Sequence, residues 1–192
     1  MNAKSLQRPG LQRQSGFSLI EVLVAAVIMS VGVLGVAGMQ VASLQQNRTA
    51  LLRSEAQQIA WDIADRMLVN VEADYSGIDF TDTPSLGTNC NTSDCSFAQM
   101  AAFDITQWQC AINSVDGNGD EYGACDTLGI TGSLPGGQGQ IETKGDDDEC
   151  DMSDAQDEGE YCVIVRWLNT DGSTYSSVRL RTRTKFDDPP VT

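Results

Sequence analysis

An uninterrupted apolar run near the N-terminus limits what this chain can become. Residues 17–44 contain one charged side chain, Glu21, in 28 positions. At about 1.5 Å per residue, a helix of this length can cross a hydrocarbon core about 30 Å thick. The run is too long for the central part of a secretory signal peptide, and no small-x-small cleavage site follows it. The sequence therefore predicts a membrane helix that stays in the mature protein.

The charges on the two sides of this run differ in sign. Residues 1–16 contain Lys4, Arg8 and Arg13 and no acid, which places them on the cytoplasmic side by the positive-inside rule. Residues 71–162 carry 20 acidic side chains and one base, Lys144. Such a region repels nucleic acid phosphates and anionic membrane surfaces, so we expect no nucleic acid partner.

All cysteines lie in the polar, Gly-rich part of the chain. Six thiols in such a region predict a disulfide framework formed in an oxidising compartment. A zinc site is disfavoured because the chain has no His and no C-x-x-C pair. Many connectivities are open to six cysteines, and we favour sequential pairs because short loops cost the least entropy to close. These pairs are Cys90–Cys95, Cys110–Cys125 and Cys150–Cys162.

The segment "GFSLIEVLVA", Gly16–Ala25, resembles the prepilin signal of type IV pilins and of type II secretion pseudopilins. The resemblance implies that a membrane aspartyl peptidase, the prepilin peptidase, cuts after Gly16 and methylates the new amino group of Phe17. Residues 1–16 would then be a leader peptide. Residues 17–44 would be the transmembrane and assembly half of an N-terminal helix.

Glu21 stands where the family has its glutamate, at the fifth position of the expected mature chain. A carboxylate at membrane depth costs about 2.5 to 3.5 kcal/mol by insertion measurements. In a filament of packed helices, the resemblance implies that the α-amino group of Phe17 on a neighbouring subunit neutralises Glu21 and sets the axial register. The alternative is a glutamate that is satisfied within its own helix.

Three glycines, Gly32, Gly35 and Gly38, interrupt the same helix. Each weakens a helix interior by about 0.8 to 1 kcal/mol relative to Ala. Two interpretations stay open. The small residues let helices approach closely, or the segment extends locally when it packs in a filament.

Beyond Leu44 the helical period continues among polar residues, and we expect one helix from Phe17 to Val69. Residues 45–69 are predicted to form its amphipathic half, with an apolar stripe that packs on a sheet. Trp61 lies near the stripe and is interpreted as a packing residue. The stripe consists of Leu52, Ala56, Ile59, Ile63 and Met67.

Residues 70–192 are predicted to form a globular domain. Its first part, through residue 94, is rich in Gly, Pro, Asn and Asp and is expected to form loops. The apolar positions of residues 96–113 fit a short amphipathic helix. The segment "LPGGQGQI", residues 134–141, is interpreted as a tight turn that enters a strand at Gln140.

The C-terminal part has the clearest strand signals. "YCVIVRWL", residues 161–168, is rich in β-formers and is followed by the hairpin signal "NTDGS". Within residues 175–186, apolar side chains or Thr then alternate with basic side chains, which is typical of a strand with two different faces. One face is expected to cover the long helix and consists of Val178, Leu180, Thr182, Thr184 and Phe186. The other is basic and consists of Arg179, Arg181, Arg183 and Lys185. The basic face either protects a sheet edge or docks an acidic neighbouring subunit.

The acidic loops resemble a calcium site only in part. Asp116, Asn118 and Asp120 match the start of a calcium loop, but Glu121 replaces the required glycine and Thr127 the terminal Glu. Loop solvation is the favoured account of this segment and of the acidic residues 145–151. The chain also has no His, no Gly-rich phosphate loop and no G-x-S-x-G motif, so we expect neither an enzyme nor a cofactor.

Three further segments resemble PilV-type minor pilins: residues 47–67 with "ADRM", the pattern of Ala102, Asp104 and Trp108, and "LPGGQGQI". The resemblance implies an α+β pilin-like fold, with a long N-terminal helix on an antiparallel sheet. It also implies a single-pass protein of the bacterial inner membrane with a periplasmic domain, which later enters the extracellular pilus.

The partners implied are other minor pilins, the major pilin and the inner-membrane pilus assembly machinery. The role implied is priming of pilus assembly, in support of twitching motility and adhesion. The alternatives are a type II secretion pseudopilin, a membrane-tethered periplasmic calcium-binding protein, and a secreted enzyme with a hydrophobic anchor.

Overall fold

The computed structural model describes residues 16–143, 150 and 159–184. The chain divides into two compact units, residues 1–47 and residues 48–192. Helix α1, Leu19–Val69, begins in the first unit and ends in the second. It starts two residues later than predicted because the Ser18 carbonyl accepts the first helical hydrogen bonds, from Glu21 N at 3.0 Å and Val22 N at 3.3 Å. Serine is a favoured residue at the position before a helix.

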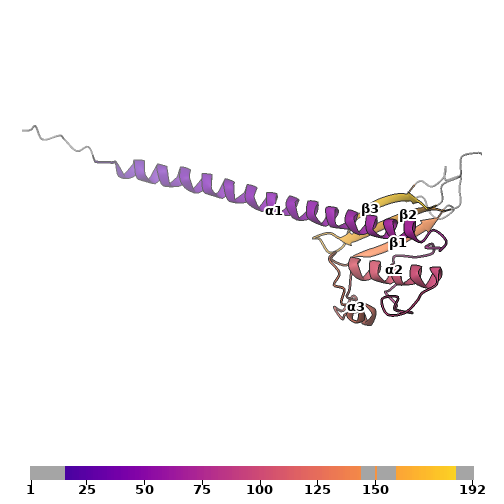
Figure 1. The fold of residues 1–192 in the computed structure, drawn as a ribbon. Helices are drawn as coiled ribbons and strands as arrows, with labels where there is room; N and C mark the ends of the chain where they lie inside the picture. The colour runs from indigo at the N-terminus through magenta and orange to yellow at the C-terminus, as the bar shows by residue number, and fades with distance from the viewer. Residues whose placement is uncertain (1–15, 144–149, 151–158, 185–192) are drawn as a thin grey trace, which may run out of the picture. The chain divides into compact units, whose positions relative to one another are not determined.

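The second unit contains the remaining helices and a three-stranded antiparallel sheet in the order β1-β2-β3 (Figure 1). Its helices are α2, Phe97–Ile112, and α3, Gly123–Leu128. Its strands are β1, Gln138–Thr143, β2, Glu160–Leu168, and β3, Tyr175–Arg183. The predicted α+β class with a long N-terminal helix on an antiparallel sheet is confirmed.

One face of the sheet carries the hydrophobic core. The apolar stripe of α1 and the buried face of α2 pack against this face. Val178 and Leu180 point to it, as the alternation in β3 predicts, whereas Phe186 and Lys185 lie outside the described residues. The core combines Ala56, Ala60, Ile63 and Met67 of α1, Trp108 and Ile112 of α2, and Ile141, Val163, Val165 and Trp167 of the sheet.

The opposite face of the sheet has a smaller apolar cluster. Cys162 and Ile164 of β2 are fully buried there, and Phe80 and Cys150 pack against them. Because successive residues of a strand point to opposite faces, the two faces of β2 are both covered. This explains why "YCVIVRWL" is a nearly continuous apolar run.

Helix α2 is bounded by the residues that its sequence suggests. Ser96 is the N-cap. Its hydroxyl accepts from Gln99 N at 3.3 Å, and the Gln99 side chain accepts from Ser96 N at 2.9 Å. This reciprocal capping box satisfies two main-chain donors that a helix start leaves unpaired. The helix ends at Ile112, within one residue of the predicted boundary.

Further details differ from the sequence-based expectations. Strand β1 begins at Gln138, two residues before Gln140, because β2 extends far enough to pair with it, Arg166 opposite Gln138. Helix α3 was not predicted. Trp61 is 57% exposed, so it is not the packing residue that its position near the apolar stripe indicated.

Candidate functional site

The candidate functional site in the first unit is the start of α1. Gly16 and Phe17 precede the helix, and Phe17 is 84% exposed. Every residue from 16 to 44 is exposed, although nearly all are apolar. By length and composition, α1 is the one described helix that could cross a membrane. An apolar surface of this extent needs lipid or other protein helices around it.

Glu21 lies in the first turn of α1. A carboxylate is favourable at this end of a helix because the unpaired N–H groups carry partial positive charge. Within the described part of the chain, no ion pair or side-chain hydrogen bond reaches this carboxylate. The intrahelical partner considered as an alternative is therefore not seen among the described residues.

In the second unit, a polar cluster joins α1 to α2. Arg66 Nη1 donates to Asp104 Oδ1 at 3.0 Å and to Gln107 Oε1 at 2.6 Å, and Arg66 Nε donates to Asp62 Oδ2 at 2.9 Å. Burial acts to lower the pKa of Arg66, but its hydrogen bonds and charge interactions with Asp104 and Asp62 outweigh burial and raise the pKa. The guanidinium thus stays charged and binds carboxylates on both helices.

The buried side of the same cluster contains Tyr75 and Asn70. The Tyr75 hydroxyl donates to Asp104 Oδ2 at 2.8 Å, and Asn70 Nδ2 donates to the Tyr75 hydroxyl at 3.2 Å and to the Phe97 carbonyl at 2.9 Å. Burial is the main cause that raises the pKa of Tyr75. The arrangement fastens the end of α1 to α2.

Trp108 makes the second link between the helices. Its indole N–H donates to the Ile59 carbonyl at 3.1 Å, and its side chain is fully buried. On its other side it covers Gly139 of β1, where an added Cβ would lie 2.4 Å from Trp108 Cη2. The segments that resemble minor pilins, "ADRM", "DITQW" and "LPGGQG", therefore meet at one place in the fold.

Comparison with known families gives two matches. The family model described as "Type IV pilin Tt1218" matches residues 38–106. The model of the prokaryotic N-terminal methylation motif matches residues 11–37, which include Gly16, Phe17 and Glu21. The two matches, which together span residues 11–106, support a type IV pilin-like family for this chain. No curated protein and no solved structure gives a significant match.

The three disulfides of this pilin-like chain are Cys90–Cys95, Cys110–Cys125 and Cys150–Cys162. These are the sequential pairs that the short-loop argument favours. Cys110 and Cys125 are fully buried, and their bond joins α2 to the short helix α3. The Cys150–Cys162 bond instead joins residue 150 to β2, on the sheet face opposite to α2.

The acidic loop is built around Asp116. Its carboxylate accepts from Asn118 N at 2.8 Å and from Asp120 N at 3.0 Å, and these main-chain hydrogen bonds lower its pKa. The carboxylate therefore caps its own turn. Within the described residues, no group of three or more His, Cys, Asp or Glu could hold a metal ion, and most of residues 145–151 lie outside them.

The predicted basic face of β3 is described only in part, because Lys185 lies outside the described residues. Arg181 Nε donates to Glu160 Oε1 on the neighbouring strand β2 at 2.7 Å. This pair supports the interpretation that the arginines stabilise the edge of the sheet. A role in docking another subunit stays a prediction.

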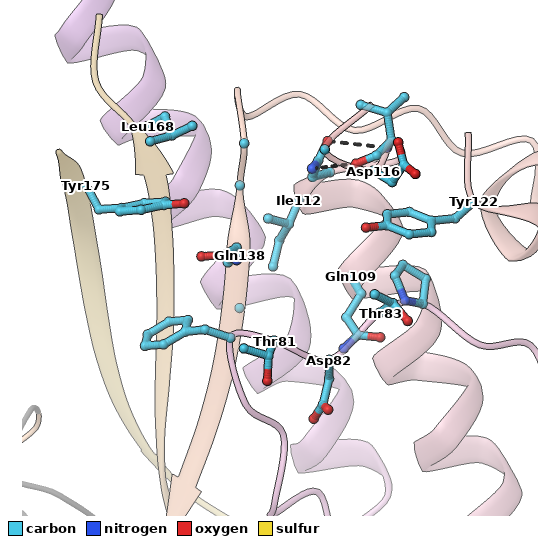
Figure 2. A pocket seen from close by; sticks show the side chains of 18 residues that line it. Thr81, Asp82, Thr83, Gln109, Ile112, Asp116, Tyr122, Gln138, Leu168 and Tyr175 are labelled. Carbon is cyan, nitrogen blue, oxygen red and sulfur yellow. Dashed lines mark hydrogen bonds between the residues drawn. The ribbon is translucent and has the colours of Figure 1, made fainter. Parts of the chain in front are cut away.

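One feature of the domain that the sequence did not predict is a cavity of about 250 Å³ between α2, β1 and the loop around residues 80–84. Figure 2 shows Gln109 and Ile112 on α2, Gln138 on β1 and Thr81, Asp82 and Thr83 on the loop around it. The residues that line it are separated by up to 95 positions in the chain, from Phe80 to Tyr175, so no local motif could announce it.

Proposed function

We propose that this chain is a PilV-type minor pilin that enters type IV pili and helps to prime their assembly. In this proposal the prepilin peptidase cuts after Gly16 and methylates Phe17. The α1 segment of residues 17–44 then holds the protein in the bacterial inner membrane, with the globular domain in the periplasm. Incorporation into the pilus moves the same segment from lipid into a bundle of subunit helices.

The observation that carries the proposal is the position of Glu21. It lies in the first turn of an exposed apolar helix, inside the segment that matches the N-terminal methylation motif. A carboxylate in such surroundings is costly unless a positive charge compensates it. The methylated amino group of Phe17 on a neighbouring subunit would supply that charge. The Glu21 carboxylate would be unpaired in a single subunit and paired in the filament, so its free-energy cost would favour the assembled state.

A minor rather than a major role is supported by the resemblance of the globular domain. The residues shared with PilV-type proteins include Arg66, Asp104 and Trp108, and these side chains hold α1 and α2 together. The acidic domain, in a chain of net charge −15, also suits contacts with selected partners better than close packing of many identical copies, which would repel one another.

Deletion and complementation in the source bacterium test the proposal. Loss of the protein is expected to reduce surface pili and twitching sharply while the major pilin level stays normal. Glu21→Ala is expected to be cleaved and inserted into the membrane but to fail in restoring pili. Asp94→Ala, which removes an exposed carboxylate from the loop closed by Cys90 and Cys95, is the matched control and should restore them.

Two outcomes would contradict the proposal. Full piliation by Glu21→Ala at matched protein level would show that the carboxylate is dispensable. A deletion strain with normal pili but defective secretion of folded enzymes would assign the protein to type II secretion instead.

A further inference from the structure

The cavity between α2, β1 and the loop around residues 80–84 has open hydrogen-bonding groups on its walls. Its volume of about 250 Å³ approaches the lower end of the range for ligand pockets, about 300 Å³. Apolar contacts come from Phe80, Ile112 and Leu168, on three different segments of the chain. Figure 2 shows the polar side chains of Gln109, Asp82 and Thr83 to one side of Ile112.

The first open group is the main chain of Gly139. Ile141 N donates to the Ile78 carbonyl at 2.9 Å, so Ile141 directs its main-chain groups away from β2. In an antiparallel pair this direction alternates from residue to residue. The N–H and C=O of Gly139, two positions earlier, therefore also point to the outer edge of β1. Gly139 itself lines the cavity.

Segment 78–84 covers this edge only at Ile78. The bridge between Ile78 and Ile141 is a single contact, and the chain then leaves β1 along Thr81 and Thr83. Within the described residues, Gly139 N–H and C=O have no hydrogen-bond partner. An edge strand with open main-chain groups is a template for pairing with another extended chain.

The second open group is the side-chain amide of Gln109. The residue is 9% exposed, and its amide makes no hydrogen bond to any other described residue. Gln109 lines the cavity, and Figure 2 shows its amide directed toward the loop that carries Asp82 and Thr83. A primary amide offers two donors and one acceptor, which match the C=O and N–H groups of a peptide.

The charge of the walls restricts the ligand further. Asp82 and Asp116 line the cavity, and no Lys or Arg does so among the described residues. Arg166 lies behind the rings of the lining residues Phe80 and Tyr175 and compensates charge on that side, whereas the side of Asp82 and Asp116 favours a neutral or basic ligand. A purely apolar ligand would leave the Gln109 amide and the Gly139 main chain unpaired, which is unfavourable in a buried site.

We propose that this cavity binds a short, extended, neutral or basic peptide segment of a partner protein, which pairs with the open edge of β1 at Gly139 and is held by the Gln109 amide. Main-chain pairing gives such binding its affinity, and the side-chain pockets beside the strand give its selectivity. The proposal does not depend on Glu21 or on the membrane segment.

An array of random capped hexapeptides provides the probe. The full mature chain is used in a zwitterionic detergent that carries no sugar head group. Peptides that bind are expected to be neutral or basic. Their N-methylated versions, which lack the main-chain donors, are expected to bind at least tenfold more weakly. In solution NMR, a bound peptide should shift the Gly139 amide signal and slow its hydrogen exchange at least tenfold.

Variants separate this site from the rest of the surface. Gln109→Leu replaces the amide with an apolar side chain and removes its hydrogen bonds, and is expected to weaken peptide binding about tenfold. Gln57→Leu, the same change at an exposed position of α1, is the matched control and should leave binding unchanged. If Gln109→Leu does not fold, Thr83→Val on the opposite wall takes its place, with a smaller expected loss.

Three results would overturn the proposal. One is that no peptide on the array binds more weakly when Gln109 or Thr83 is replaced. Another is equal binding of the N-methylated peptides. The third is a shift of the Gly139 signal by N-acetylglucosamine or galactose but by no peptide, which would make the cavity a saccharide site.

Discussion

Trp108 on α2 donates its indole N–H to the main-chain carbonyl of Ile59 on α1, at 3.1 Å. The acceptor is a carbonyl in the interior of a helix, and the donor is a fully buried side chain. Together with the bonds of Arg66 to Asp104 and Gln107, this bond links α1 and α2 directly. The core of the domain is arranged around this contact.

Replacing Trp108 should therefore be costly. Trp108→Phe loses the hydrogen bond, leaves the Ile59 carbonyl without its side-chain donor and opens space in the core, so we expect a loss of about 2 to 4 kcal/mol in unfolding free energy. Trp61→Phe is the matched control, because Trp61 is 57% exposed, and should cost less than about 0.5 kcal/mol. Denaturant unfolding followed by circular dichroism measures both. An equal loss of unfolding free energy in the two variants would contradict this account of the core.

Gly139 should tolerate no side chain. An added Cβ would lie 2.4 Å from Trp108 Cη2 and 2.6 Å from Ile112 Cδ1, so Gly139→Ala forces a shift in packed rings and is expected to cost about 1 to 3 kcal/mol. Gly87→Ala meets nothing within 4 Å and serves as the control. The difference in melting temperature between the two variants is the measurement. A stable Gly139→Ala with unchanged melting temperature would argue against the packing of Trp108 on β1.

Tyr75 should make stability fall at alkaline pH. Burial, followed by its hydrogen bond to Asp104, raises the pKa of Tyr75 above the ordinary value of about 10, although the hydrogen bond from Asn70 acts to lower it. The protonated hydroxyl is thus favoured in the folded state. Its contribution is complete below about pH 10 and is lost as the pH rises from there toward the raised pKa.

Tyr75→Phe is expected to flatten the decline of unfolding free energy between about pH 10 and pH 12. Tyr175→Phe, which changes a tyrosine that is 44% exposed, should keep the wild-type slope. Tyr161, whose pKa burial also raises, is retained in both variants and contributes equally. An unchanged slope in Tyr75→Phe would mean that the Tyr75 hydroxyl ionises in the folded protein as readily as in the unfolded chain.

The disulfides should differ in their contribution to stability. The Cys110–Cys125 bond closes a loop with a sequence separation of 15, so its removal by paired Ser substitutions is expected to cost about 3 kcal/mol. The Cys90–Cys95 bond, with a separation of 5, should contribute about 2 kcal/mol or less. Peptide mapping without reduction checks the pairing. A peptide that joins Cys90 to a cysteine other than Cys95 would refute it.

The mature N-terminus tests the processing of the chain. Cleavage after Gly16 predicts that protein recovered from cells begins with N-methylated Phe17. Intact-protein mass spectrometry, with fragmentation of the first residues, measures this directly. Gly16→Leu is expected to leave the leader in place. Its control is Gly32→Leu, a change within α1 that adds no contact in the first unit and should still be cleaved. An N-terminus at Met1 or Ala26 in the wild type would contradict the prediction.

Local patterns by themselves determined several elements of this protein. The apolar run before Leu44, the repeat of Ile59, Ile63 and Met67, and the alternation in β3 each depend on residues that are neighbours along the chain. The period of a helix or strand makes such neighbours share one face whatever the rest of the fold does. The family assignment has the same origin, since the segment Gly16–Ala25 is continuous.

Contacts and burial that involve residues far apart in the sequence were decided by the tertiary structure alone. Arg66 and Asp104 are 38 positions apart, and their ion pair exists because the fold packs α1 and α2 against the same core. Trp61 was expected to pack because of its position near the apolar stripe, but it is 57% exposed in the folded domain. Gln109 lines the cavity, and its amide has no hydrogen-bond partner among the described residues. Burial is a property of what surrounds a side chain, and those surroundings come from segments that a local pattern does not include.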